Sequence, residues 1–279
     1  MNPSPSFLTV EDYNALPSLP ADERIAYGPH DQQFGDLYLP QTQPPYPVII
    51  LIHGGCWRAL YGLEPLGKLC RAFTAEGIAV WNIEYRRLGN GGGWPTTFHD
   101  VAQAADYLRQ LAVSYQLNLN HVITMGHSAG GHLATWLAGR PNLRSESELY
   151  TAEPLPLHGV VSLAGIPDMA AAVAQNICRG APQELLAGYP DAVPDHYRDG
   201  SPSELLPLGI IQVLVNGDQD PIVPTPYVRD YQTAAQQAGD IVHLNEIKQA
   251  AHFELITPDS HAWPVIKEAA LDLLNQDSG

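Results

Sequence analysis

Apolar residues occur along this chain in short runs, and several of these runs have the composition of a β-strand. Continuous stretches of Val, Ile, Leu and Ala predict strands that are buried on both faces. The earliest stretch instead alternates between apolar and polar residues, which is also typical of a strand. The predicted strands cover residues 34–40, 48–52, 78–83, 121–127, 159–164, 209–215 and 241–247.

Segments in which apolar residues return every three or four positions lie between these runs and predict helices. The longest covers residues 97–115, and its apolar stripe includes Val101, Ala105 and Leu108. The other predicted helices cover residues 63–75, 133–137, 226–238 and 263–274. Because strands alternate with helices, we expect a mostly parallel, doubly wound α/β sheet with helices on both faces.

Two segments do not follow this alternation. Residues 1–20 are rich in Pro and Ser, and we expect them to form an arm lying on the domain. Residues 168–207 contain many prolines and few apolar runs, which predicts a short cap insertion between two strands. The length of 279 residues and the 45% hydrophobic content suit one large α/β unit, so we expect a single domain spanning residues 1–279.

The charge of the chain narrows the choice of partners. Lys and Arg number 14 against 30 Asp and Glu, which gives a formal net charge of -16. Such an acidic surface argues against nucleic acids and anionic membranes and favours neutral or cationic small substrates. No apolar run approaches the length of a membrane-spanning helix, and the N-terminus lacks the pattern of a signal peptide. We therefore expect a small-molecule substrate and neither a nucleic-acid nor a membrane partner.

The cysteines suggest a reducing compartment. Their number is odd, and the spacing of Cys56, Cys70 and Cys178 matches no metal-binding or CxxC pattern. We therefore predict reduced thiols in a cytoplasmic protein. Cys56 lies beside a glycine pair, and we expect it to line a site there and not to act as a nucleophile.

One motif carries chemistry of its own. The predicted strand 121–127 runs directly into Gly126-His127-Ser128-Ala129-Gly130, and a predicted helix follows. Gly-x-Ser-x-Gly between a strand and a helix is typical of a nucleophile elbow, a strained turn that lifts the serine hydroxyl clear of the sheet. The flanking glycines avoid collisions with the neighbouring strand and helix. This context predicts that Ser128 is a nucleophile.

A serine nucleophile requires a base and an acid that orients the base. In an elbow-type sheet these follow in the order serine, acid, histidine, on loops after late strands. Asp220 follows the strand 209–215; Asp218 is its competitor, and we favour Asp220 because Asp218 falls within the turn. His252 follows the strand 241–247 on a loop at the same edge, which predicts that it is the base.

An acyl-transfer site also needs donors for the oxyanion of its tetrahedral intermediate. The strand 48–52 ends in a glycine pair, Gly54 and Gly55, whose backbone can approach a ligand closely. These residues and Ala129 are the predicted donors. Trp57 and Trp94 lie in loops at the same edge, where they could wall a substrate pocket or pack elsewhere in the protein.

These motifs occupy residues 53–57, 84–87, 126–132, 217–224 and 252–253. Together they resemble the α/β-hydrolase superfamily, in particular the esterase branch of arylformamidases (kynurenine formamidases) and hormone-sensitive-lipase-like carboxylesterases. The His-Gly-Gly-x-Trp form is similar to arylformamidases. The resemblance extends from about residue 34 to the C-terminal helix. It implies an α/β-hydrolase fold and a hydrolase that uses no metal and no organic cofactor.

The expected activity is that of a serine hydrolase which cleaves carboxylic esters or aryl formamide-type amides through an acyl-enzyme. A peptidase or acyl-peptide hydrolase is the alternative within the enzymes, although the chain has no room for the added gating domain that such enzymes usually carry. A non-catalytic binding protein on the same scaffold is the alternative outside them. It is disfavoured because Ser128, Asp220 and His252 are all present.

Overall fold

The computed structural model describes residues 7–275 and builds them around one 8-stranded sheet. The strands lie side by side in the order β1-β2-β4-β3-β5-β6-β7-β8. Pairing is antiparallel between β1, β2 and β4 and parallel from β4 onward. The strands are β1 (Glu23–Ala26), β2 (Phe34–Tyr38), β3 (Tyr46–Ile52), β4 (Ala79–Ile83), β5 (Leu117–His127), β6 (Gly159–Leu163), β7 (Ile211–Gly217) and β8 (Val242–Ile247).

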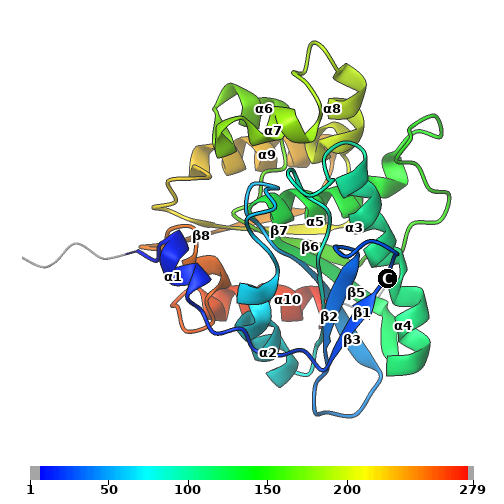
Figure 1. The fold of residues 1–279 in the computed structure, drawn as a ribbon. Coiled ribbons are helices and arrows are strands. Elements are labelled where there is room, and N and C mark those ends of the chain that lie inside the picture. Colours follow the sequence, from blue (N-terminus) through cyan, green and yellow to red (C-terminus); the bar gives the residue numbers. More distant parts are fainter. Residues whose placement is uncertain (1–6, 276–279) are drawn as a thin grey trace, which may run out of the picture.

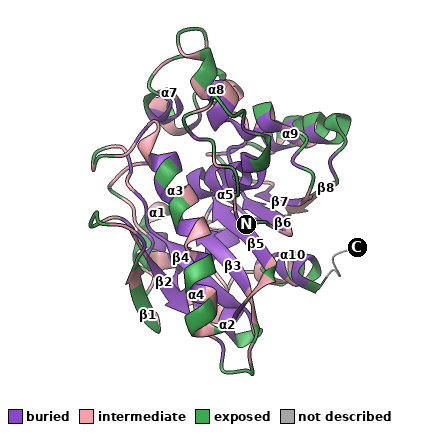
Figure 2. Ribbon diagram, turned by 90° about the vertical axis from the view of Figure 1, so that its right-hand side faces the viewer, coloured by how far each residue is buried: buried purple, intermediate pink, exposed green. Residues whose placement is uncertain are grey.

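The predicted strands all occur, with ends shifted by a few residues. Among the described strands, only β1 was not predicted. It lies at the edge of the sheet, and its side chains are exposed or half-buried, so its sequence carries no apolar pattern. The central strands are the opposite case, because residues 48–52 of β3 are fully buried. Figure 2 shows this buried layer running through the middle of the molecule.

Helices cover both faces of the sheet, as expected for a doubly wound fold (Figure 1). On one side α5 and α9 pack against β5, β6, β7 and β8, and on the other lie α2 and α10. The longer helices are α2 (Gly67–Ala75), α3 (Thr96–Asp106), α4 (Leu108–Tyr115), α5 (Ala129–Gly139), α9 (Thr225–Ala238) and α10 (Trp263–Asn275). None of the helices in this part of the chain combines the length and apolar composition needed to cross a membrane.

The single helix predicted over residues 97–115 is instead a pair, α3 and α4, which meet at Tyr107. The backbone of Tyr107 stays in the right-handed helical region, and its N–H donates to the carbonyl of Gln103. The second segment therefore continues the first with a local change of hydrogen bonding. The amphipathic pattern does not detect it because Ala105 before the junction and Leu108 after it are both buried.

Residues 168–207 connect β6 to β7 through short helices (Figure 1). The segment lies beyond α5 and α9, on the side of the molecule away from α2 and α10. It contacts the rest of the fold through buried bonds, such as the one that His132 Nε2 donates to the Gly200 carbonyl at 2.8 Å. The helices are α6 (Met169–Ala174), α7 (Ala181–Leu185) and α8 (Pro194–Gly200).

Candidate active site

Ser128 stands at the turn between β5 and α5 in a backbone conformation that L-residues rarely adopt, with φ 54° and ψ −119°. The crowding around it explains the two flanking glycines. A Cβ on Gly126 would lie 2.0 Å from the carbonyl oxygen of Gly130, and one on Gly130 would lie 2.1 Å from that of Ile52. Only glycine fits at either position, so the local geometry is that of a nucleophile elbow.

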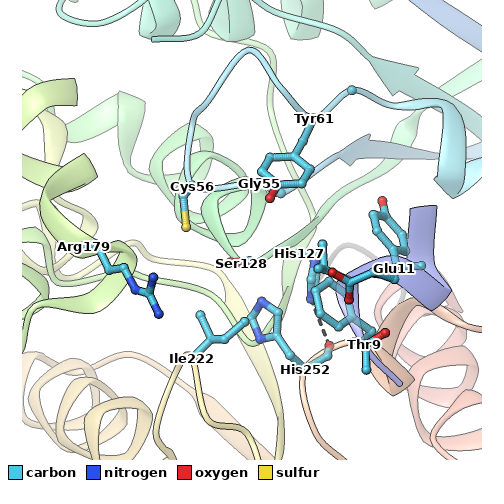
Figure 3. Close-up of a pocket in the computed structure, with 15 residues that line it drawn as sticks. Thr9, Glu11, Gly55, Cys56, Tyr61, His127, Ser128, Arg179, Ile222 and His252 are labelled. Atoms are coloured by element: carbon cyan, nitrogen blue, oxygen red, sulfur yellow. Dashed lines mark hydrogen bonds between the residues drawn. The ribbon is translucent and has the colours of Figure 1, made fainter. Parts of the chain in front are cut away.

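His252 and Asp220 come from two loops at the same edge of the sheet and form a buried pair. His252 Nδ1 lies 2.7 Å from Asp220 Oδ2. The other carboxylate oxygen, Oδ1, accepts the backbone N–H groups of Ile222 at 2.8 Å and Val223 at 2.9 Å. These two donors fix the carboxylate, so the carboxylate in turn fixes the orientation of the imidazole. Figure 3 shows Ser128 and His252 facing one cavity.

Asp218, the competing acid, serves another position. Its Oδ1 accepts the backbone N–H of Gln249 at 2.8 Å, and Lys248 Nζ lies 3.5 Å from its Oδ2. Asp218 therefore supports the turn that leads into the His252 loop. The structure thus brings Asp220, and not Asp218, to the imidazole of His252.

Two of the three predicted oxyanion donors line the same cavity, and the third, Ala129, directly follows Ser128. Gly54 and Gly55 line the cavity next to Ser128, and a Cβ on Gly54 would lie 2.7 Å from the His127 carbonyl oxygen. The φ of Gly55 is 105°, and the next two residues, Cys56 and Trp57, are also left-handed at 49° and 53°. Within residues 7–275, the N–H groups of Gly54, Gly55 and Ala129 donate to no other residue. They are available to an oxygen atom placed in the cavity.

A buried ionic cluster supports this strained loop from behind. His53 Nε2 donates to Glu84 Oε1 at 2.9 Å, and Arg87 Nη1 lies 3.1 Å from the same oxygen. Burial by itself would raise the pKa of Glu84, but the attraction of His53 and Arg87 and the hydrogen bonds from His53 and Tyr85 lower it. His53 Nδ1 also donates to the Gly54 carbonyl at 2.8 Å. The carboxylate thus anchors the loop that carries the candidate oxyanion donors.

The two tryptophans do not line this cavity. Trp57 is fully buried and contacts the edge of the His132 ring, with 5.3 Å between centroids. Trp94 stacks on His196 at 4.3 Å and donates its indole N–H to Glu148 at 2.7 Å. The pocket role considered for them is therefore wrong. A left-handed backbone at Trp57 turns its side chain into the core, which no local sequence pattern reveals.

The cavity has a volume of about 520 Å³ and owes one wall to the N-terminal arm. The short helix α1 (Val10–Asn14) is preceded by its N-cap, Thr9, which forms a reciprocal capping box with Asp12. The Thr-x-x-Asp pattern could have predicted this helix, but not its docking site. Residues 1–6 of the predicted arm lie outside the described residues. The arm residues that line the cavity are Thr9, Val10, Glu11 and Tyr13.

Glu254 joins this arm to the loop that carries the candidate base. Its Oε1 accepts the backbone N–H of Leu8 at 2.7 Å, and its Oε2 accepts that of Ala251 at 3.0 Å. The ring of Tyr13 also stacks on Phe253 with 5.4 Å between centroids. One buried carboxylate therefore holds together segments 246 residues apart in the sequence, which periodicity cannot detect.

The cysteine prediction requires a correction. Cys56 and Cys178 form a disulfide, with 5.6 Å between their Cα atoms, and only Cys70 is a free, buried thiol. The expectation of reduced cysteines is thus wrong for two of the three. Disulfides are rare in the cytosol, so the cytoplasmic location loses the argument on which it rested and stays a prediction. Cys56 does line the cavity, as expected.

Two buried histidines near Ser128 are neutral. Burial and the neighbouring His252 hold the pKa of His127 well below its usual value, and its Nε2 donates to the His252 carbonyl at 3.0 Å. Burial lowers the pKa of His132 to about 4. His127 lines the cavity, which the sequence did not indicate, whereas His132 packs beneath it. No group of three or more metal-binding side chains occurs in the described residues.

The neutral His132 predicts acid sensitivity of the fold. Its pKa is about 4 in the folded chain, so between the unfolded value near 6.5 and 4 only the unfolded chain takes up the proton. The contribution of the neutral His132 to the stability of the fold is complete above about pH 6.5 and is lost as the pH falls. The unfolding free energy of wild type falls between about pH 7.5 and pH 5. We expect this fall to be about 2 kcal/mol smaller in His132→Gln. Urea unfolding measures this difference. The exposed His99→Gln should behave as wild type, and equal losses in all three proteins would contradict the prediction.

Comparison with known proteins identifies the family of the chain. Residues 35–233 match the model of the BD-FAE family. Esterase LipC of Mycobacterium tuberculosis is 27% identical over 259 residues, which cover 86% of this chain and 62% of LipC. Kynurenine formamidase of Danio rerio is 23% identical over 83% of this chain and 74% of that protein. A truncated carbohydrate esterase from gut microbiota has a TM-score of 0.75 and 21% identity, over 92% of this chain and 99% of the other.

The sheet, the elbow and these similarities define an α/β-hydrolase fold that is similar to the folds of esterases. Because the family match covers more than half of its length, the chain belongs to the BD-FAE family. The expected fold and the resemblance to esterases and arylformamidases are confirmed. The chain spans less than two thirds of LipC, at 62% of its length.

Proposed function

We propose that this protein is a serine esterase that cleaves small carboxylic esters through an acyl-enzyme. The observation that carries the proposal is the contact of 2.7 Å between His252 and Asp220 at the wall of the cavity that also exposes the strained Ser128. We further propose that the chain forms one domain, in which residues 168–207 act as a cap over this cavity.

In the proposed mechanism, Ser128 attacks the ester carbonyl while His252 Nε2 takes the proton of the hydroxyl. Asp220 holds Nδ1 protonated, which leaves Nε2 free to act as the base. The carbonyl oxygen becomes an oxyanion and accepts hydrogen bonds from the N–H groups of Gly54, Gly55 and Ala129. These N–H groups make no other hydrogen bond in the described residues, so they need break none when charge develops.

The intermediate then collapses, and His252 returns its proton to the leaving alcohol. A water molecule enters, loses a proton to the same imidazole and attacks the acyl-enzyme, which releases the acid and restores Ser128. The neutral state of His127 supports this cycle, because a second cation 4.4 Å from the His252 ring would oppose its protonation.

Formamide-type amides are a second candidate substrate class. The similarity to a kynurenine formamidase supports this extension, and the chemistry differs only in the leaving group. The cavity of about 520 Å³ has room for a small ester or an aryl formamide. Peptide cleavage and a purely binding role have no comparable support, because the relatives named above are an esterase and a formamidase.

A substrate panel with an active-site probe tests the proposal. We expect hydrolysis of p-nitrophenyl acetate and butyrate, slower hydrolysis of formanilide and none of a simple dipeptide. A fluorophosphonate probe should label one residue, Ser128, identified by peptide mass spectrometry. Formanilide cleavage faster than ester cleavage would reverse the order of the two candidate classes. Absence of both turnover and labelling would favour the binding-protein alternative.

A further inference from the structure

Arg179 is a cation on the cavity wall that has no acidic partner. Among residues 7–275, every other lysine and arginine except Arg144 forms an ion pair with a carboxylate. The Arg179 side chain also makes no hydrogen bond within this range. Acidic residues outnumber basic ones by 30 to 14, so an unpaired arginine beside a cavity departs from the pattern of the protein.

The position of Arg179 places its charge within reach of a bound substrate. Figure 3 shows its side chain extending toward Ile222 and the cavity that exposes Ser128. A second cavity of about 390 Å³ lies next to the first, and Arg179, Cys56 and Ile222 line both. The guanidinium therefore stands where the space next to Ser128 continues into a side cavity.

The segment that carries Arg179 is held in place. Cys178, directly before it, is bonded to Cys56, which directly follows the oxyanion loop glycine Gly55. The φ values of Cys178 and Arg179 are 57° and 48°, a left-handed conformation that persists only where the surroundings impose it. The disulfide is such a constraint, and it joins the backbone next to Arg179 to the loop that carries the candidate oxyanion donors.

We propose that Arg179 binds a carboxylate carried by the substrate, so that the enzyme prefers esters with an anionic group remote from the scissile bond. The proposal rests on the esterase function proposed above and names its substrate class. A guanidinium binds a carboxylate through two parallel hydrogen bonds, which gives both strength and orientation. Figure 3 shows Glu11 on the opposite side of Ser128, where it repels an anion. The two charges thus direct the anionic end of the substrate toward Arg179.

The charge of Arg179 is opposite in sign to the net charge of the protein. A net charge of -16 favours neutral or cationic substrates at long range. At short range the charges that line the cavity dominate, because solvent and salt screen charges beyond about 10 Å, and Arg179 is the cation among them. We therefore expect the preference for an anionic ester, measured as a ratio of kcat/KM values, to be largest at low ionic strength and to decrease as salt is added.

Matched ester pairs test the proposal. On the acyl side, p-nitrophenyl hexanoate is compared with the p-nitrophenyl monoester of adipic acid, which replaces a terminal methyl by a carboxylate. On the alcohol side, para-tolyl acetate is compared with para-acetoxybenzoate. For at least one pair we expect wild type to favour the anionic member. In Arg179→Gln, kcat/KM for that member should fall about tenfold, mainly through KM, with the neutral member unchanged.

Two further variants separate charge from structure. Arg179→Lys keeps the charge but loses the planar fork, and we expect it to retain part of the preference. Arg144→Gln removes the other unpaired arginine, which is exposed and does not line the cavity, and we expect no effect. Circular dichroism and the melting temperature should be the same in all variants, because none of the substitutions changes a buried side chain.

The outcomes distinguish this inference from the function on which it rests. Two results for Arg179→Gln would overturn the role of Arg179. One is an equal loss of activity toward the neutral and anionic members, and the other is no change toward either member of both pairs. In both cases the esterase activity that depends on Ser128 would remain. Failure of wild type to hydrolyse any ester would instead overturn the proposed function. If Arg179→Gln still preferred the anionic ester, another residue would bind the carboxylate of the substrate.

Discussion

Ser128→Ala is expected to lower kcat/KM for p-nitrophenyl butyrate by roughly 10⁴- to 10⁶-fold, the largest effect of any single substitution proposed for this protein. The change removes one oxygen atom from a residue whose backbone is already left-handed, at φ 54°. Alanine has the same conformational restrictions there as serine, so the elbow should persist. What remains is the rate due to the oxyanion donors and substrate binding, without a nucleophile.

The measurement is steady-state hydrolysis together with the melting temperature. Ser145→Ala, at an exposed position away from the cavity, is the matched control and should be indistinguishable from wild type. The melting temperature of Ser128→Ala should also stay close to that of wild type. A variant that is folded and keeps more than a small fraction of the activity would show that another group attacks the substrate.

Asp220→Asn should have the second largest effect, a loss of roughly 10⁴-fold in kcat. The asparagine oxygen can still accept the N–H groups of Ile222 and Val223, now bonded to Asp220 Oδ1 at 2.8 and 2.9 Å. Its NH₂ group then faces His252 Nδ1 and stabilises the tautomer with a proton on Nε2. That imidazole cannot take the proton of Ser128, although its position hardly changes.

Asp218→Asn is the control that the sequence itself provides. The Asp218 carboxylate accepts the N–H of Gln249 at 2.8 Å, and an asparagine oxygen can do the same. We expect activity within about threefold of wild type, because the ion pair with Lys248 is exposed. Comparable losses of activity in Asp220→Asn and Asp218→Asn would mean that the role of the catalytic acid does not belong to Asp220 alone. A large loss in Asp218→Asn alone would exchange the two roles.

The residues of the site that the sequence predicted share one property. Ser128, Asp220 and His252 each follow a strand with a clear apolar pattern, and parallel strands end at the same edge of a sheet. Local periodicity and chain order were therefore enough to bring them together. Gly54 and Gly55 were found in the same way, as a glycine pair at the end of β3.

The residues that the sequence missed, or misplaced, depend on contacts between distant segments. The wall formed by the N-terminal arm requires Glu254, which is 246 residues away from Leu8. The placement of Arg179 depends on a disulfide that joins residues 122 positions apart. Trp57 lies next to the predicted donors in the sequence, yet its side chain is buried beneath them.

By itself, the sequence determined the order of strands and helices, the elbow at Ser128 and the chain order of the proposed catalytic residues. These follow from short-range rules, namely side-chain periodicity and the need for glycine beside a strained turn. Only the tertiary structure decided which side chains enclose the cavity, which cysteines are bonded and where an unpaired cation lies. Such features arise when segments far apart in the chain pack together, and the composition of one segment does not reveal which surface of another it will meet.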